Sequence, residues 1–278
     1  QPSRFRSIEY RAMAVRRALS VTLLATIPAM EACDSRDDRG VAADALPNVD
    51  RTTMQPQVAA ALEAARLAVV NNQSSAEAWG NYACLLDAHE LADPATVCYR
   101  RAHDLDPTSF RWAYLLGTTL EGRDLEIDQI LAPFQAAARI DSGFAPLYHR
   151  MGEVLSTRGD PNEARAAYEQ ALRIDDSLAV THRSLGQLLL SANETELAVA
   201  HLERADALMP SERTINASLA CAYRRMGRES QAIDRTNRTR SCAEHISLPD
   251  ALKFEIAQKN ISLEKCRERA LAAFNRGD

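Results

Sequence analysis

The sequence predicts an all-α fold, an α–α superhelix of about five helix-turn-helix repeats with a capping helix at each end. Two observations support this prediction. A pattern of apolar and small residues recurs every 34 residues through the middle of the 278-residue chain. Each copy also holds two stretches in which apolar residues follow helical spacing.

The recurring positions are clearest in the first copy, where they hold Trp79, Tyr82, Ala83, Leu86, Ala95, Tyr99, Ala102 and Pro107. Corresponding residues follow in three further copies, with one extra residue in the loop of the second copy, between Leu120 and Ile130. A fifth copy starts with Asn216 and fades after Ala232. The copies are assigned to residues 76–109, 110–144, 145–178, 179–212 and 213–240.

This spacing resembles the tetratricopeptide repeat, whose signature is W-x2-L-G-x2-Y…A-x3-F…A…P. The resemblance implies helix pairs that stack into a superhelix, with the first helix of each pair on the concave side. We expect helices near residues 76–89, 92–105, 109–122, 126–139, 145–157, 161–173, 179–191, 195–207, 213–226 and 229–240.

The residue types at these positions have a physical explanation. One position in each copy holds a small residue, which allows two helices to approach closely. These residues are Ala83, Gly117, Gly152, Gly186 and Ala220. Large residues are expected to fill the space between neighbouring pairs, and they are Tyr99, Phe134, Tyr168 and Leu202. Pro107 and Pro210 should end their helices, because proline cannot donate a helical hydrogen bond.

Both edges of the array have helical patterns of their own. Residues 56–75 hold an apolar pattern over Gln57–Val70 that predicts an N-terminal capping half-repeat. Residues 241–278 hold another over Leu248–Phe274, with Pro249 in the first turn, where proline is favourable. We expect this helix to cap the fading fifth repeat, since the ends of such arrays need covering.

The N-terminal segment has the layout of a secretory signal. Residues 1–12 look like a non-native or over-extended leader, and residues 13–32 carry Arg16 and Arg17 before a short apolar run. Ala32 and Cys33 resemble a bacterial lipoprotein cleavage box, although Glu31 departs from it. Cys33 is therefore the predicted lipidation site, and residues 33–55 are a predicted flexible tether. The expected location is the periplasm or a membrane anchor, and the alternative is a cytoplasmic protein.

Composition argues against several function classes. The net charge is −5 and no basic block follows the signal, which disfavours nucleic-acid binding. The histidines lack metal-ligand spacing, and neither a Cys-x-x-Cys pair nor a glycine-rich phosphate loop occurs. We therefore expect no enzyme activity, cofactor, metal or small-molecule substrate. Cys242 and Cys266 are candidates for a disulfide, with free thiols as the alternative.

The concave side is the predicted binding surface for a peptide or helix of a protein partner. Its candidate residues occupy equivalent positions on successive first helices: Arg111, Tyr114, His149, Glu153, Arg183, Gln187 and Arg224. Gly80, Cys84, Asp87 and Glu121 are expected on the same side. The subgroup that grips chaperone carboxylates has lysine and asparagine where this chain has Gly80 and Cys84, so that function is not carried over.

Two alternatives to an exported scaffold remain open. One is an accessory module that acts in trans within an enzyme complex, such as a glycosyltransferase or a cytochrome c or respiratory assembly. The other is a cytosolic adaptor, which would require that Met13–Cys33 is not a signal.

Overall fold

The structure is a computed structural model that describes residues 46–158, 160–210, 212–239, 247–262, 265–266 and 268–269. All of them belong to one compact unit, Val41–Asp278. The predicted leader, the signal peptide, Cys33 and residues 34–45 of the predicted tether lie outside the described residues. Among the described residues, no helix combines the length and apolar character needed to cross a membrane.

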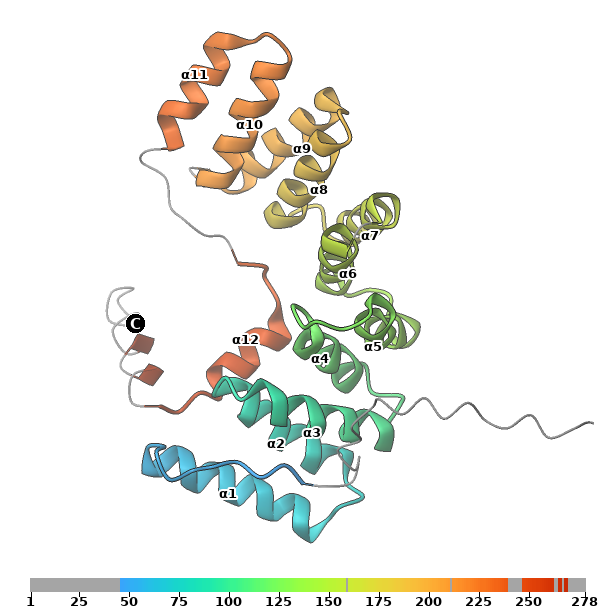
Figure 1. The fold of residues 1–278 in the computed structure, drawn as a ribbon, viewed down its shortest axis with the longest axis vertical. Coiled ribbons are helices and arrows are strands. Elements are labelled where there is room, and N and C mark those ends of the chain that lie inside the picture. The colour runs from blue at the N-terminus through green and yellow to red at the C-terminus, as the bar shows by residue number, and fades with distance from the viewer. Residues whose placement is uncertain are drawn as a thin grey trace, which may run out of the picture. The chain divides into compact units, whose positions relative to one another are not determined.

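The prediction of an all-α fold is confirmed, since the described residues form twelve α-helices and no strand (Figure 1). The helices are α1 (Pro56–Asn71), α2 (Ala76–Ala88), α3 (Ala92–Leu105), α4 (Phe110–Leu120), α5 (Ile127–Ile140), α6 (Ala145–Arg158), α7 (Pro161–Ile174), α8 (Ala179–Ser191), α9 (Thr195–Leu208), α10 (Arg213–Arg225), α11 (Glu229–Arg238) and α12 (Ala251–Gln258).

Helices α2 to α11 form five sequential antiparallel pairs, and each pair packs against the next. Every helix predicted from the repeat spacing is present, with both ends within two residues of the prediction. The repeat spacing therefore locates the helices because each copy places its small and large residues at the same points of contact.

Polar residues set the helix boundaries between repeats. Asp106, Asp141 and Asp175 follow the ends of α3, α5 and α7, and each accepts a hydrogen bond from the amide two residues later, at 3.1, 2.7 and 2.9 Å. Such local turns compete with continuation of the helix. Pro107 and Pro210 follow the C-caps of α3 and α9, as the sequence predicts.

Glycines allow close contact between the two helices of a repeat. A Cβ atom on Gly117 would lie 2.5 Å from the Phe134 ring, and one on Gly186 would lie 2.6 Å from Leu202. A Cβ atom on Gly152 would likewise lie 2.5 Å from the Tyr168 ring. The predicted close approach is confirmed, and the large residue of the second helix is the direct neighbour.

Gly80 has a different role from the one that we predict for it. It is expected on the concave side, but its Cβ would lie only 2.3 Å from the indole of Trp112. Gly80 is therefore a packing residue, because Trp112 of the next repeat fills the space above it.

The N-terminal capping helix is present as α1, which packs against α2. The last residues of the predicted tether, 46–55, differ from expectation because they pack against this region. Val49 is buried, and Leu46 and Met54 are partly buried against the core. Arg51 forms an ion pair with Glu63 of α1 at 3.0 Å. Apolar side chains thus hold this stretch in place, despite its polar composition.

The prediction for the C-terminal helix is wrong in two respects. A helix over Leu248–Phe274 is expected, but α12 ends at Gln258 and residues 260–262 are not helical. It is also expected to cover the fifth repeat, whereas α12 packs against α2 at the start of the array (Figure 1). Hydrogen bonds and ion pairs to α2, α4 and α6 explain this position, and they define the candidate site.

Candidate functional site

The candidate site is the surface formed by equivalent positions of the first helices, which we call the first-helix face. It consists of Cys84, Asp87, Arg111, Tyr114, Thr118, Glu121, His149, Glu153, Arg183, Gln187 and Arg224. Residues 247–262, which we call the C-terminal segment, lie on the part of this face that α2, α4 and the start of α6 provide (Figure 1).

Asp250 is the central contact of the C-terminal segment. Its side chain is only 2% exposed and pairs with Arg150 of α6, at 3.0 Å between Oδ2 and Nη2. The Tyr114 hydroxyl also donates to Oδ2. The other oxygen, Oδ1, accepts from the amides of Leu252 and Lys253, both at 3.1 Å, and so caps the start of α12. One carboxylate therefore starts the helix and fixes it to the face.

Arg150 connects the C-terminal segment to the array. Its Nη1 lies 2.6 Å from Glu121 Oε2, and its Nε donates to the Tyr114 hydroxyl at 2.8 Å. Burial alone would lower the pKa of Arg150, but Tyr114, Glu121 and Asp250 raise it above its ordinary value. Burial raises the pKa of Glu121, and Arg150 offsets part of that increase. The arginine thus stabilises two carboxylates that would otherwise be buried without a countercharge.

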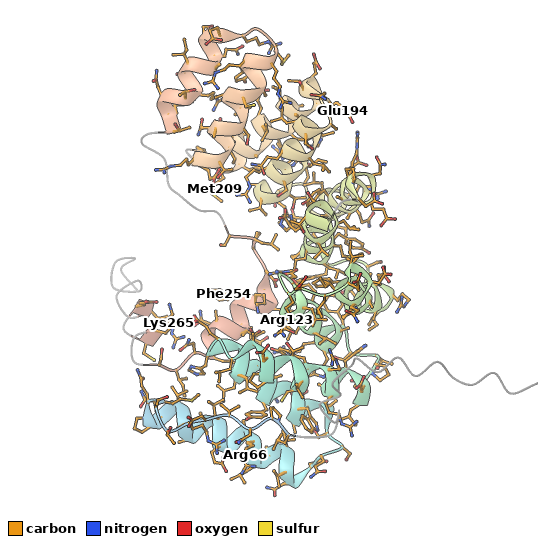
Figure 2. The ribbon with its side chains drawn as sticks, in the orientation of Figure 1. Arg66, Arg123, Glu194, Met209, Phe254 and Lys265 are labelled. Atoms are coloured by element: carbon orange, nitrogen blue, oxygen red, sulfur yellow. The ribbon has the colours of Figure 1, made fainter. Side chains whose placement is uncertain are left out.

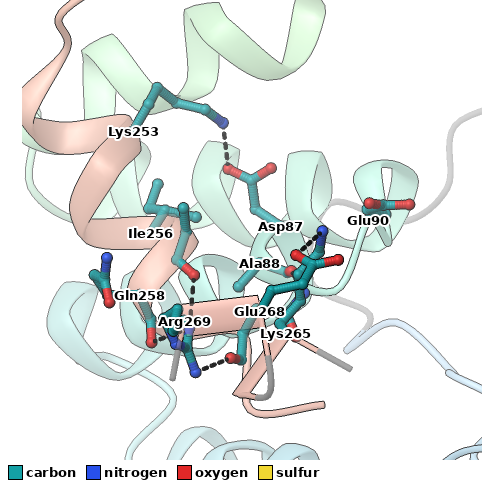
Figure 3. A pocket seen from close by; sticks show the side chains of 11 residues that line it. Asp87, Ala88, Glu90, Lys253, Ile256, Gln258, Lys265, Glu268 and Arg269 are labelled. Atoms are coloured by element: carbon teal, nitrogen blue, oxygen red, sulfur yellow. Dashed lines mark hydrogen bonds and ion pairs between the residues drawn. The ribbon is translucent and has the colours of Figure 1, made fainter. Parts of the chain in front are cut away.

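Two further ion pairs hold α12. Arg111 donates to both carboxylate oxygens of Glu255, at 2.8 and 2.7 Å, a bidentate geometry that favours specificity. The hydrogen bonds from Arg111 lower the pKa of Glu255. Lys253 Nζ lies 2.8 Å from Asp87 Oδ2 at the end of α2 (Figure 3). The three charged residues of the segment, Asp250, Lys253 and Glu255, therefore each pair with a residue of opposite charge on the array.

Apolar contact adds to these pairs. Ile256 is 2% exposed, and Leu248, Leu252 and Ile261 pack against the core. Phe254 remains 66% exposed on α12 (Figure 2). The segment thus contacts the array with charged and apolar side chains together, while one large apolar side chain stays free of the core.

A pocket lies where the end of α12 meets the end of α2. Asp87, Ala88 and Glu90 line it from the array, and Lys253, Ile256 and Gln258 line it from α12 (Figure 3). Asn260 donates to the Ala88 carbonyl at 2.7 Å. Arg269 donates to the carbonyls of Ala257 and Asn260, at 3.3 and 2.7 Å, which satisfies acceptors at the end of the helix.

Tyr114 has a different environment from the exposed position that we expect. It is fully buried, and its ring lies 5.7, 5.9 and 5.2 Å from the rings of Phe110, Phe134 and Phe144. Its hydroxyl is the part that reaches Asp250. An alanine at Tyr114 would therefore disturb the core as well as the face, because three aromatic neighbours would lose their contact.

His149 is likewise buried, at 6% exposure. Its Nδ1 lies 3.0 Å from the Thr181 hydroxyl, and its ring centroid lies 5.8 Å from that of Tyr168. Burial lowers the pKa of His149 to about 4, although Glu153 acts in the opposite direction. The imidazole is thus neutral near pH 7 and acts as a packing residue.

The remaining predicted residues lie on the open part of the face, defined as Glu153, Arg183, Gln187 and Arg224. Glu153 is 48% exposed and accepts a hydrogen bond from Tyr168 at 2.8 Å. Arg183 lies 3.8 Å from the buried Glu212, and Gln187 donates to Ser218 at 3.1 Å. Arg224 is exposed and donates to Thr236 at 2.9 Å.

The structure therefore separates the seven predicted residues into groups. Arg111 and Tyr114 contact the C-terminal segment, His149 is enclosed between α6 and α8, and the other four form the open part. The pattern of the repeats missed Arg150, Asp250, Lys253 and Glu255. Pro249 followed by Asp250 before an apolar run is a helix-start signal that could have located the anchor.

Metal and cysteine chemistry receive no support from the described residues. They include no group of three or more His, Cys, Asp or Glu side chains arranged to hold a metal ion. Cys84 and Cys98 are buried free thiols, Cys221 is partly buried and Cys266 is exposed. Cys242, the proposed disulfide partner of Cys266, lies outside the described residues.

A family comparison agrees with the repeat geometry in the middle of the array. Residues 144–211, which span the third repeat and all but the last residue of the fourth, match the tetratricopeptide repeat family model. This part of the chain carries tetratricopeptide repeats, and the helix pairs on either side of it have the same antiparallel arrangement, as the 34-residue spacing predicts. No curated protein sequence matches the chain.

Several solved structures share the fold. YrrB, described as a tetratricopeptide repeat protein with an unusual peptide-binding site, is 18% identical with a TM-score of 0.56, over 71% of this chain and 99% of YrrB. MamA from Desulfovibrio magneticus RS-1 is 14% identical with a TM-score of 0.56, over 60% of this chain and 93% of MamA. The Cut9–Hcn1 hetero-tetramer of the APC/C holds a chain that is 15% identical with a TM-score of 0.53, over 74% of this chain and 40% of that one.

Proposed function

We propose that the protein is a non-catalytic scaffold whose first-helix face binds a peptide or helix of a partner protein. One observation carries this proposal: a short helix, α12, already lies on the face and is held there by Arg111, Arg150 and Asp87. Tetratricopeptide repeat proteins bind protein partners, and YrrB is described as having a peptide-binding site.

The open part of the face is the proposed site of first contact with the partner. Glu153, Arg183, Gln187 and Arg224 come from three successive first helices, so they supply charge and hydrogen-bonding capacity along one direction. Arginine is among the residue types that most often dominate binding energy at interfaces. An extended or helical segment that carries acidic and amide groups matches these side chains.

The proposal is tested by crosslinking in intact cells, followed by mass spectrometry of the captured proteins. The test variant replaces Arg183, Gln187 and Arg224 with alanine. The matched control replaces Arg139, Arg173 and Gln231, which are exposed residues of the same types on second helices. The face variant should lose at least about tenfold in partner recovery, and the control should not. Equal recovery by both variants would move the binding site away from this face.

Export and a lipid anchor at Cys33 are part of the same proposal and rest on the arrangement of residues 13–33. The basic start, the short apolar run and the Ala32–Cys33 pair support it. Cell fractionation and intact mass measurement test it. Mature protein that begins at Cys33 and carries added acyl mass is the expected result. A cytosolic protein that retains Met13–Ala32 would instead favour a cytosolic adaptor.

A further inference from the structure

We infer that the C-terminal segment is an internal ligand of the first-helix face, and that the partner protein displaces it with a short helix of the same chemistry. This inference rests on the proposed function and specifies its ligand. The covered part of the face would then become available only when α12 leaves.

The first argument is that α12 depends on the face for its structure. It contains only eight residues, Ala251–Gln258, and isolated helices shorter than about 12–15 residues are marginal in water. Its start is capped by Asp250, the residue that also pairs with Arg150. Docking and helix formation are therefore coupled, so a competitor that occupies Arg150 also removes the support for the helix.

The second argument is that α12 contacts the face in the way that a bound peptide does, through specific ion pairs together with apolar contacts. Besides its apolar contacts and the hydrogen bond from Asn260 to Ala88, the segment is held by three ion pairs, which are Asp250 with Arg150, Lys253 with Asp87 and Glu255 with Arg111. Ion pairs at an interface give specificity and register. The one large apolar side chain outside this contact, Phe254, is 66% exposed.

These contacts define the chemistry of the competing segment. It should start a helix with an aspartate, carry a basic residue three positions later and an acidic residue five positions later. An aliphatic residue should follow at the sixth position, where Ile256 is buried. A segment with this order places its charges on Arg150, Asp87 and Arg111 and its aliphatic side chain on the core.

The experiment uses full-length chains and a fluorescent peptide with the sequence of residues 247–262. Wild type is compared with a chain that carries Asp250→Ala, in which the internal segment loses both its cap and its anchor. A linked ligand has an effective concentration in the range of about 1 mM, so wild type resists the free peptide. The peptide should bind the Asp250→Ala chain at least about tenfold more tightly than wild type, as measured by fluorescence anisotropy.

Three controls make the result specific. A peptide that carries Asp250→Ala should not bind, and adding Arg111→Ala to the Asp250→Ala chain should weaken binding of the natural peptide. A chain with Lys253→Ala and Glu255→Ala serves as a second released variant, since both side chains are partly exposed. Hydrogen exchange should increase at 251–258 in the released chains, while α2 and α4 stay protected.

Three outcomes would overturn the inference. Equal affinity for wild type and both released chains would mean that the peptide binds elsewhere, and absence of binding to well-folded released chains would mean that the segment is not a ligand. Dimerisation of wild type that disappears in the Asp250→Ala chain would assign α12 to the face of a second copy instead. The proposed function could survive each outcome, because it is tested separately on Arg183, Gln187 and Arg224.

Discussion

The two parts of the first-helix face are built on the same repeat but differ in occupancy. Along α2, α4 and the start of α6, the face is covered by the C-terminal segment, whereas Glu153, Arg183, Gln187 and Arg224 form an open part. The helix packing beneath is alike, since Gly117 and Gly186 contact Phe134 and Leu202 in the same way. The two parts therefore differ in their surface side chains and not in the packing of the glycines beneath them.

Charge explains the choice. In the covered part, Arg111 and Arg150 can meet acidic groups of the segment, and Asp87 meets Lys253. In the open part, the buried acid Glu212 already caps α10 through the Ile215 amide at 2.6 Å and lies near Arg183. The segment therefore docks where Asp87, Arg111 and Arg150 offer charges opposite to its own.

The largest expected effect comes from Arg150→Ala. This change leaves Glu121 and Asp250 without their shared countercharge, and breaking a buried pair costs about 3–5 kcal/mol. Urea unfolding should show the loss, and hydrogen exchange should increase first at residues 251–258. Arg224→Ala is the matched control in the open part, where exposed substitutions change stability by about 0.5 kcal/mol or less. Equal losses in the two variants would remove the distinction between the parts.

The next effect concerns pH and His149, which lies between the two parts. Its pKa of about 4 in the folded state is below the ordinary value of 6.5, because burial disfavours the charged form. The unfolded chain therefore binds a proton first as pH falls, and stability decreases from pH 6.5 towards pH 4 by roughly 3 kcal/mol.

His149→Asn should reduce this pH dependence, measured as the difference in urea midpoint between pH 7 and pH 4.5. Asp250→Ala should retain it, since Thr181 and Tyr168 enclose the imidazole and α12 does not. A pH dependence that disappears in the Asp250→Ala chain would show that the covering segment controls the environment of His149.

The smallest effect tests whether the scaffold is equivalent in the two parts. Gly117→Leu and Gly186→Leu should each destabilise by about 1–3 kcal/mol, because added atoms would overlap Phe134 and Leu202. Glu169→Leu on the exposed side of α7 is the control and should change the thermal midpoint little. A much larger cost at Gly117 would mean that the covered part is packed differently from the open part.

The repeat spacing was sufficient to predict the helices, but not the neighbours of each position. Gly80, Tyr114, His149 and Arg183 occupy the same position in successive repeats. In the structure they contact Trp112, Asp250, Thr181 and Glu212, respectively. The periodicity predicts the position of a residue on its helix, whereas the burial of its side chain depends on residues from other parts of the chain.

The position of α12 could not be derived for the same reason. Its ion pairs join residues as distant as Asp87 and Lys253, 166 positions apart, and no periodic pattern relates them. A capping role for the C-terminal helix assumes contact between neighbours only. The charges of Asp250, Lys253 and Glu255 are visible in the sequence, but their complementary charges become evident only when the first helices are placed side by side.

The return of α12 to α2 restricts how this array can change during evolution. Repeats in an open array can be duplicated or deleted, because each contacts only its neighbours. Here residues 240–246 alone separate the described residues Thr239 and Ser247, a stretch that can span at most roughly 30 Å. A duplicated repeat would move the end of the last repeat, at Thr239, away from Arg111 and Arg150, which would stay in place. A change in the number of repeats would therefore require a compensating change in the length of 240–246 if the segment is to keep its docking position.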